Sequence, residues 1–386
     1  MTTIDEVLTR RVTNIIPNKT KLEELLKSGR KLNVYLGIDP TATKIHIGHA
    51  VALRKLQEFV ELGHNVTFLI GDATALIGDT SDKDGERPVL INEQIKNNFK
   101  TYKKQASKIV DFSKVKVKFN STWLKKLKFL DTVKLAQEFS FGEFAGRELI
   151  KKRLQDKKRV GLHEALYPVM QGYDSYILDT DIQIGGADQT FNMQAGRFLQ
   201  QSLRNKESFV LVTGYLTGTD GRKMSKSWGN AIWLTDTADE IYGKTMSLPD
   251  NLIVEYFENA TNANENKIKE IKNALKGDVN PVFIKQELAL TLASELTNKN
   301  AAIKAKNNFR KSFQKHDPEF NLEIKLQKSL ADTVAPFTNL KSLGDAKRLI
   351  QQGGLTINGD VVTDLNYKIK KNDKIKIGKK IFAILV

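Results

Sequence analysis

Two short stretches, far apart in the sequence, carry side chains that suit phosphate chemistry. The first contains His46 and His49, which follow an apolar run and would lie one turn apart at the start of a helix. Gly48 stands between them and would let a nucleotide come close. The second contains Lys223 and Lys226 in a glycine-rich segment, so that two ammonium groups could close over a polyphosphate and open again. Together the two stretches predict an ATP site.

Each stretch has a plainer interpretation when it is taken alone. A His-x-x-His pair on a helix is commonly a surface or capping feature, and a loop rich in Lys and Ser is commonly just solvated. The order and spacing of the two stretches, and the intact string KMSKS at residues 223–227, favour the functional interpretation. The pair resembles the HIGH and KMSKS motifs of class I aminoacyl-tRNA synthetases, which stabilise the transition state of amino-acid adenylation.

Length and charge predict a protein of several domains that meets a polyanion. A chain of 386 residues exceeds the usual size of one domain, and 40% apolar residues are enough to build cores. The formal charge of +16 and the pI near 9.6 favour nucleic acid as a partner. A general abundance of Lys and Asn could explain part of the charge, but residues 321–386 alone hold twelve Lys and Arg against six Asp and Glu.

No segment predicts a membrane anchor or a disulfide. The sequence has no run of roughly twenty apolar residues, and its N-terminal segment mixes acidic with basic side chains, unlike a signal or transit peptide. We therefore expect a cytoplasmic protein. The absence of cysteine excludes disulfides and thiolate zinc sites. We expect Mg2+ to accompany ATP as a substrate and expect no structural metal bound by the protein.

The order of the predicted elements indicates an α/β fold. Apolar runs rich in β-branched residues that end at turn residues predict strands, and helical patterns separate them. The predicted strands are residues 34–38, 66–70, 115–119, 182–184 and 209–212, and residues 48–62 form the first helix between them. This alternation predicts a parallel, doubly wound sheet, in which ligands bind at the carboxyl ends of the strands.

We expect three domains. Residues 1–232 would form a Rossmann-like catalytic domain on the parallel sheet, with an insertion at roughly 120–165 and the KMSKS loop at 218–230. Residues 233–318 carry Lys, Glu and Leu at helical spacing and predict an α-helical domain. Residues from about 311 to 325 look like a linker, and residues 319–386 would hold the end of this linker and a small α+β domain.

The C-terminal segment carries clear local signals. Lys347 and Arg348 lie on a short predicted helix that ends at Gly353. Asn358-Gly359 stands between two apolar runs and predicts a hairpin. The segment resembles an S4-type RNA-binding domain, and the resemblance implies that Lys347 and Arg348 contact phosphates. A generic α+β module is the alternative.

Four further stretches resemble tyrosyl-tRNA synthetase. They are YLGIDPTA at residues 35–42, GDATALIGD at 71–79, YPVMQGYD at 167–174 and QIGGADQ at 183–189. Together with the motifs above, they extend the resemblance from the N-terminus through the S4-like tail. It implies an enzyme that activates L-tyrosine with ATP to tyrosyl-adenylate and pyrophosphate, and then transfers tyrosine to the 3'-terminal adenosine of tRNA(Tyr).

The resemblance also implies which residues hold the substrates. Tyr35 and Asp174 match the pair that recognises the phenolic hydroxyl of tyrosine, a group that both donates and accepts a hydrogen bond. Phenylalanine would leave such a pair unpartnered, which costs desolvation free energy. The implied tyrosine-binding residues are Tyr35, Asp79, Tyr167, Gln171, Asp174 and Gln189, and the implied ATP-binding residues are Gly37, Asp39, Thr41, His46, Gly48, His49, Gly185, Asp188, Lys223, Met224 and Lys226. Taken one at a time, the Asp and Gln residues could equally be turn or capping residues.

The implied reaction needs no general base. The carboxylate of tyrosine is already ionised and attacks the α-phosphate of ATP in line, so catalysis comes from positioning and from stabilising charge. His46 and His49 would donate hydrogen bonds to the developing charge, and the helix N-terminus would add its positive end. Lys223 and Lys226 would close over the departing pyrophosphate with Mg2+. These four side chains are the candidate catalytic residues.

Partners also follow from the resemblance. It implies a homodimer joined through the insertion, in which Phe139, Phe141, Phe144 and Leu149 could form the interface or could belong to the core. The helical domain would read the anticodon end of the tRNA, and the S4-like tail would steady it.

Two other functions stay open at this point. A synthetase for tryptophan shares the fold, but an indole N–H only donates and would leave the donor of the pocket unpaired. An RNA-binding protein could also use the scaffold without catalysis. Many bacterial tyrosyl-tRNA synthetases have a KFGKS-like second motif, and some have Thr where this chain has Ala52, so the sequence suggests a subgroup.

Overall fold

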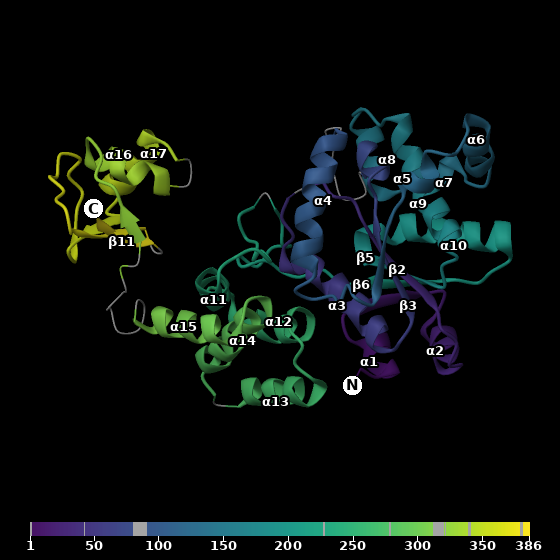
Figure 1. Ribbon diagram of the computed structural model, residues 1–386, viewed down its shortest axis with the longest axis horizontal. Coiled ribbons are helices and arrows are strands. Elements are labelled where there is room, and N and C mark those ends of the chain that lie inside the picture. Colours follow the sequence, from purple (N-terminus) through teal and green to yellow (C-terminus); the bar gives the residue numbers. More distant parts are fainter. Residues whose placement is uncertain are drawn as a thin grey trace. The chain divides into compact units, whose positions relative to one another are not determined.

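The computed structural model describes residues 2–41, 43–79, 91–226, 228–277, 279–311, 320, 322–338, 341–378 and 381–386. The chain divides into two compact units, Met1–Ala302 and Ile303–Val386 (Figure 1). The helical residues from 238 to 302, which follow the KMSKS loop, therefore belong to the first unit together with the sheet, and the helix Lys299–Phe309 continues into the second unit. The domain boundaries at residues 232 and 318 stay predictions, and the expected linker falls largely on residues 312–319, outside the described part of the chain.

A six-stranded sheet with the order β1-β6-β5-β2-β3-β4 forms the centre of the described first unit. Its parallel strands are β2 (Asn33–Ile38), β3 (Asn65–Ile70), β4 (Val115–Phe119), β5 (Ile182–Gly186) and β6 (Phe209–Thr213). They match the predicted strands and confirm the α/β class. The remaining strand, β1 (Val12–Ile16), pairs antiparallel with β6 at the sheet edge and was not predicted. Thr13 and Asn14 interrupt its apolar pattern because they lie exposed at the edge.

Helices connect and cover the strands (Figure 1). The predicted first helix is α3 (Ile47–Glu61), which follows β2 directly. Four short helices of the insertion lie between β4 and β5. Besides α3, the helices up to β6, including α5 to α8 of the insertion, are α1 (Ile4–Thr9), α2 (Lys19–Lys27), α4 (Asn92–Ala106), α5 (Ser121–Leu124), α6 (Phe129–Gln137), α7 (Phe141–Ala145), α8 (Glu148–Gln155), α9 (Leu162–Ile177) and α10 (Thr190–Arg204), with single turns η1 (Thr74–Leu76) and η2 (Ala187–Gln189).

The four apolar residues of the insertion that could form an interface or belong to the core differ in how far their side chains are buried. Phe144 is only 5% exposed and belongs to the buried residues of the protein, whereas Phe141 is 64% exposed. Phe139 and Leu149 are half-buried, and the Phe139 ring lies 5.6 Å from the ring of Phe198. Phe144 is therefore a core residue, and Phe141 is the one of the four whose side chain is largely open to solvent.

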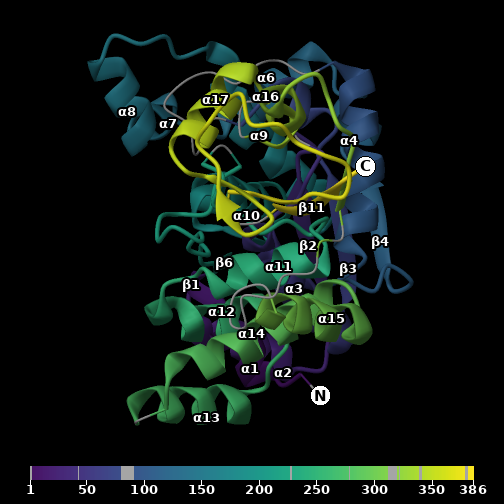
Figure 2. The same ribbon diagram turned by 90° about the vertical axis from the view of Figure 1, so that its left-hand side faces the viewer.

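The helical segment follows the KMSKS loop, as expected. It consists of α11 (Ala238–Met246), η3 (Asp250–Leu252), α12 (Ile253–Ala260), α13 (Glu265–Lys276), α14 (Pro281–Leu296) and α15 (Lys299–Phe309). Helix α14 begins after a break that follows α13: the Asn280 side chain accepts a hydrogen bond from the backbone of Val282, and Pro281 is the first residue of the helix. Helix α12 packs on both α3 and α14 (Figure 2).

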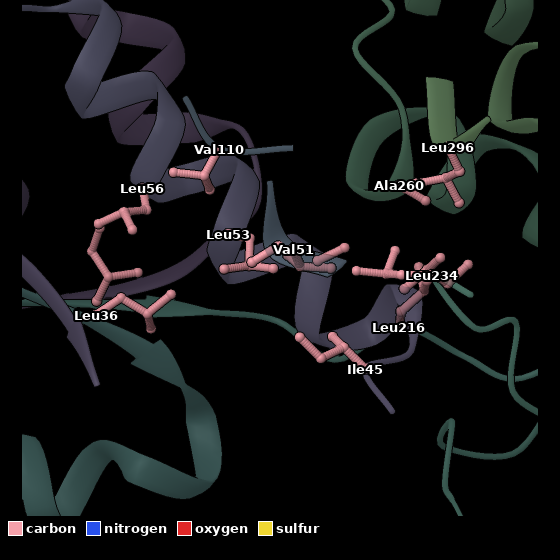
Figure 3. Close-up of a cluster of buried hydrophobic side chains, with 14 of the residues drawn as sticks. Leu36, Ile45, Val51, Leu53, Leu56, Val110, Leu216, Leu234, Ala260 and Leu296 are labelled. Carbon is pink, nitrogen blue, oxygen red and sulfur yellow. The ribbon is translucent and has the colours of Figure 1, made fainter. Parts of the chain in front are cut away.

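One hydrophobic core runs from the sheet into the helical segment. Leu36 of β2 and Leu53 of α3 belong to the same buried cluster as Leu216, Ala260 and Leu296 (Figure 3). Since apolar burial is the main favourable term in folding, this shared core fixes the first helices of the segment against the sheet.

The second unit has its own sheet and core. Its strand order is β7-β11-β10-β8-β9, and the residues of its core are separate from those of the first unit. The predicted hairpin is confirmed: β8 and β9 pair antiparallel, and Asn358 and Gly359 have φ angles of 51° and 100°. The elements are β7 (Leu322–Ile324), α16 (Leu330–Val334), η5 (Ala335–Phe337), α17 (Leu343–Gln351), β8 (Leu355–Ile357), β9 (Asp360–Val361), β10 (Lys374–Ile377) and β11 (Ile381–Leu385).

Within the described residues of both units, no helix combines the length and the apolar composition that a bilayer span requires.

Candidate active site

One cavity of about 840 Å3 in the first unit collects the predicted tyrosine-binding and ATP-binding residues. It lies where β2 and β5 end and α3 begins, which is the edge of the sheet that the strand order predicts for a ligand. Every residue of the two predicted sets lines it: Tyr35, Gly37, Asp39, Thr41, His46, Gly48, His49, Asp79, Tyr167, Gln171, Asp174, Gly185, Asp188, Gln189, Lys223, Met224 and Lys226. Lys347 and Arg348 lie on α17 in the second unit, so the cavity does not include them.

His46 and His49 form the first wall of the cavity. His46 is the N-cap residue of α3, and its ring centre lies 3.8 Å from that of His49. The backbone of the next residue, Ile47, donates a hydrogen bond to the carbonyl of Ile232, which ties the helix start to the segment after the KMSKS loop. At Gly48, a Cβ atom would lie 2.9 Å from His46 Nδ1, so a side chain there would displace the imidazole.

Both imidazoles are neutral near pH 7. Burial, followed by the charges of Lys226 and Lys223, lowers the pKa of His46 to about 3. Burial and then the neighbouring His46 keep the pKa of His49 well below its usual value. Within the described residues, the buried Nδ1 atoms of both rings have no hydrogen-bond partner. Each neutral ring therefore has one N–H to donate and adds no net charge of its own.

The KMSKS loop also lines the cavity, beside the histidines, and Ser227 of this motif lies outside the described residues. Lys223 Nζ lies 3.6 Å from the centre of the Tyr215 ring, a cation–π contact. The buried side chain of Asn230 organises the loop: its Oδ1 accepts the backbone N–H of Ser225 at 2.9 Å, and its Nδ2 donates to the carbonyl of Lys223 at 3.2 Å. Asn230 thus orders the backbone that carries the lysines.

Tyr35 lies at the inner end of the cavity with a fixed hydrogen-bond direction. Its hydroxyl donates to Gln183 Oε1 at 2.9 Å, and Gln183 Nε2 donates to the carbonyl of Met193 at 2.9 Å. Because a carbonyl only accepts, the amide of Gln183 must point its nitrogen toward Met193 and its oxygen toward Tyr35. At Gly196, a Cβ atom would lie 2.5 Å from Gln183 Nε2, so this glycine provides the room for the amide. Tyr35 is left with its oxygen lone pairs for a ligand.

Asp174 shares this end of the cavity. Its Oδ1 accepts a hydrogen bond from Trp123 Nε1 at 2.7 Å, and its Oδ2 accepts one from Asn120 Nδ2 at 3.0 Å. Burial raises the pKa of Asp174 to about 7, although these two hydrogen bonds act in the opposite direction. The carboxyl is therefore held in one orientation by two donors from the start of the insertion.

Two further carboxylates, those of Asp39 and Asp79, also line the cavity. Asp39 accepts hydrogen bonds from the Tyr167 hydroxyl at 2.9 Å and from the Thr74 hydroxyl at 2.8 Å. Asp79 accepts one from Gln189 Nε2 at 2.6 Å. Burial, followed by the charge of Asp39, keeps the pKa of Tyr167 well above its usual value, so this hydroxyl stays protonated and donates. Two anionic groups with ordered partners are thus available to a cationic ligand group.

Sequence reasoning missed several residues that hold the site in shape. They are Thr74, Asn120, Trp123, Gln183, Asn192, Tyr215 and Asn230, each of which contacts a predicted residue. Asn120 follows β4 at the sheet edge where ligands gather, which is a signal that could have been used. Trp123 gives no such signal, because its partner lies 51 positions away.

Comparisons with known proteins agree with this geometry. Residues 27–314 match the family described as tRNA synthetases class I (W and Y), and residues 339–375 match the S4 domain. The chain therefore belongs to the class I tRNA synthetases, a family of enzymes. A tyrosine–tRNA ligase of Dehalococcoides mccartyi is 40% identical over 98% of this chain and 98% of its own length, and one of Thermotoga maritima is 36% identical over 98% and 96%. Within its class, the chain belongs to the tyrosine–tRNA ligases.

Solved structures agree on the fold. A C-terminally truncated mitochondrial tyrosyl-tRNA synthetase of Aspergillus nidulans matches 80% of this chain and 93% of its own, with a TM-score of 0.67 and 22% identity. A tyrosyl-tRNA synthetase of Archaeoglobus fulgidus, solved with L-tyrosine, matches 78% of this chain and 98% of its own, with a TM-score of 0.63 and 22% identity.

Proposed function

We propose that the chain activates L-tyrosine with ATP in this cavity and then transfers tyrosine to the 3'-terminal adenosine of tRNA(Tyr). The observation that carries the proposal is the continuity of the cavity, whose walls include both the Tyr35 and Asp174 end and the His46 and Lys223 end. A phenol bound at one end and a triphosphate bound at the other would bring the carboxylate of tyrosine to the α-phosphate.

The inner end of the cavity selects the amino acid in this proposal. Tyr35 offers a lone pair and Asp174 offers a carboxyl group, and the hydrogen bonds described above hold both groups in place. Asp79, Tyr167 and Gln171 would surround the substrate ammonium, with Asp79 as the anion. Phenylalanine has no hydroxyl to bind the remaining lone pairs of these two groups, and each hydrogen bond left unmade on a buried group costs about 1–3 kcal/mol.

The outer end stabilises charge. His46 and His49 are neutral and would donate N–H groups to the phosphate oxygens, while Lys223 and Lys226 bring positive charge to the leaving pyrophosphate. Asp39 and Gln189 would orient the adenylate. Because the attacking carboxylate is already ionised, none of these groups has to remove a proton in the first step.

Mg2+ is proposed to enter with ATP. Within the described residues, no group of three or more His, Cys, Asp and Glu side chains is placed to hold a metal ion. Mg2+ keeps several waters and binds phosphate oxygens readily, so the triphosphate can carry it. The chain would contribute the positive charge of Lys223 and Lys226 beside it.

The tRNA is proposed to contact the S4 domain and the helical segment. Lys347 and Arg348 lie exposed on α17, where they could reach phosphates. We propose that this domain steadies the tRNA and that the helical segment reads the anticodon end. We also propose that the protein works in the cytoplasm.

A homodimer is proposed through the insertion. Helices α6, α7, α8 and α9 expose large apolar side chains, and clusters of this kind commonly mark interfaces. The exposed residues are Phe129, Leu130, Val133, Phe141, Leu154 and Leu162, and Phe129 and Leu162 are 81% and 77% exposed. A second copy of the chain would cover them.

Amino-acid-dependent exchange of pyrophosphate into ATP tests the proposal. It is run without tRNA in the presence of tyrosine, phenylalanine or tryptophan. We expect exchange with tyrosine alone, because only tyrosine supplies a hydroxyl to Tyr35 and Asp174. Exchange with tryptophan in preference to tyrosine would refute the pocket assignment, and no exchange with any amino acid would favour a noncatalytic RNA-binding role.

A further inference from the structure

Helix α12 holds the root of the KMSKS loop through one residue, Thr217. The carboxylate of Glu255 accepts the backbone N–H of Thr217 at 2.7 Å with one oxygen and its hydroxyl at 3.0 Å with the other. The hydroxyl of the next residue, Tyr256, donates to the Thr217 carbonyl at 2.6 Å. Two consecutive residues of α12 therefore bind the N–H, the side-chain hydroxyl and the carbonyl of one loop residue that lies 38 and 39 positions earlier.

Thr217 is in turn connected to Lys223 by the backbone. The two residues form an antiparallel bridge, and the carbonyl of Leu216 accepts the N–H of Met224 at 3.1 Å. Gly218 N–H donates to the Arg222 carbonyl at 2.6 Å on the other side of this bridge. The strand pair is short, so a displacement of Thr217 moves the main chain of Lys223 with it.

Helix α12 is a firm support for this contact. Its C-terminal carbonyls accept hydrogen bonds from the guanidinium group of Arg10, at 2.9 Å to Glu258 and 2.8 Å to Thr261. Arg54 of α3 donates to Glu295 of α14 at 2.7 Å and also to Asn262, just beyond α12. The helix that carries the histidine pair and the helix that holds the KMSKS loop are thus fixed to each other.

The hydrophobic core also holds the root of the KMSKS loop in place. Leu216, directly before Thr217, is 1% exposed and lies in the same buried cluster as Leu234 and Leu296 (Figure 3). The loop root is therefore held by apolar packing on one side and by the Glu255 carboxylate on the other. A carboxylate is suited to this task because its two oxygens accept an N–H and an O–H together.

We propose that Glu255 is a positioning residue for adenylation: through Thr217 it sets where the main chain of Lys223 stands and hence where the ammonium meets the phosphates. The inference rests on the proposed role of Lys223. It gives the helical segment a part in the chemical step, although Glu255 itself does not line the cavity.

Substitutions at Glu255 test this role in the full-length protein. Glu255→Ala removes both acceptors, and Glu255→Gln keeps one oxygen for the Thr217 N–H. Glu258→Ala is the matched control, because this glutamate of the same helix pairs its side chain with the exposed Lys272. We expect Glu255→Ala to lower kcat of pyrophosphate exchange about tenfold and leave the KM for tyrosine unchanged, since the phenol end is untouched. Glu255→Gln should fall between Glu255→Ala and the control.

A double-mutant cycle with Lys223→Ala separates positioning from a general loss of structure. If Glu255 acts through Lys223, Glu255→Ala should change the rate of the Lys223→Ala protein by less than about twofold, because the group that it positions is already gone. A cost that is the same in both backgrounds would overturn the inference. Melting curves of all variants check that each one folds.

The outcomes also separate this inference from the proposed function. Exchange by the unsubstituted protein together with an unaffected Glu255→Ala variant would overturn the inference alone. No tyrosine-dependent exchange by the unsubstituted protein would overturn both. A rise in the KM for tyrosine of Glu255→Ala with kcat unchanged would also overturn the inference about Glu255, because the contact between Glu255 and Thr217 would then serve amino-acid binding.

Discussion

Replacing Asp174 with asparagine tests the hydrogen-bond arrangement at the phenol end of the cavity. Both carboxyl oxygens of Asp174 already face donors, Trp123 Nε1 at 2.7 Å and Asn120 Nδ2 at 3.0 Å. An asparagine has one acceptor oxygen and one NH2 group, so in either flip its NH2 faces one of these donors. The carboxamide must shift, and the phenolic hydroxyl loses an acceptor that can carry charge.

The size of the effect follows from the loss of that acceptor. A hydrogen bond to a charged group contributes about 1.5–3 kcal/mol, and one to a neutral group contributes about 0.5–1.5 kcal/mol. A net loss of about 1–2 kcal/mol corresponds to a decrease of about 5- to 30-fold in kcat/KM for tyrosine. Phenylalanine has no hydroxyl and should lose much less. We therefore expect the ratio of kcat/KM values for tyrosine over phenylalanine to fall by the same 5- to 30-fold, about 1–2 kcal/mol.

Pyrophosphate exchange with each amino acid measures this ratio, and the KM for ATP is the internal control, expected within about twofold of the unsubstituted protein. The double variant Asp174→Asn/Trp123→Phe removes one of the competing donors without restoring the charge. It should melt no lower than the single variant and should keep the reduced ratio. An unchanged ratio in the single variant, or a ratio restored in the double variant, would refute the reasoning.

Three further results are expected. The pKa of His46 is lower in the folded chain than its unfolded value of 6.5, so the unfolded state takes up protons first and the His46 contribution to stability is lost as pH falls from about 6.5 toward 3. The free energy of unfolding in urea should therefore decrease less between pH 7 and pH 4 for His46→Asn than for the unsubstituted protein. An equal decrease in both proteins would contradict this prediction. Joint replacement of Lys347 and Arg348 by alanine should leave the rate of pyrophosphate exchange within about twofold but weaken tRNA binding, and the slope of log K against log salt concentration should decrease by about two. An equal loss of pyrophosphate exchange and of tRNA binding would exclude a role confined to tRNA. Phe141→Asp should shift the protein from dimer toward monomer in sedimentation, and a monomeric unsubstituted protein would contradict the proposed interface.

The strands and the ligand edge could be predicted because their signals are local. The run at residues 34–38 is β-branched, ends at turn residues and is followed by a helical pattern, so it needs no knowledge of its neighbours in space. Strand β1 could not be predicted in the same way. Its pairing joins Val12 to Thr213, and it lies at a sheet edge where exposed polar residues are allowed. The pairing of Val12 with Thr213 exists only once the sheet has formed, so no local pattern in the sequence indicates it.

The residues of the candidate site also divide into those with a local sequence signal and those without one. Residues inside contiguous motifs, such as His46 and Lys223, could be named from sequence, and the structure brings them to one cavity. Several of the residues that orient the site could not, since they contact partners from distant segments. Gln183 lies 148 positions from Tyr35, and Glu255 lies 38 positions from Thr217. The motifs therefore predict which groups line the cavity, whereas the hydrogen-bond directions of these groups are set by the fold.

In the proposed function, selectivity for tyrosine follows from these hydrogen-bond directions. The amide of Gln183 is oriented by the Met193 carbonyl and accepts a hydrogen bond from the Tyr35 hydroxyl, so Tyr35 presents only its oxygen lone pairs to the cavity. Trp123 and Asn120 hold both oxygens of Asp174, so the carboxyl cannot turn away when a ligand lacks a hydroxyl. A ligand without a phenolic hydroxyl would therefore leave the remaining lone pairs of two buried groups unmatched, and neither group could turn to find another donor without breaking a hydrogen bond that it already has. The discrimination consequently belongs to the whole network, since removing any one of its outer members frees an inner one to rotate.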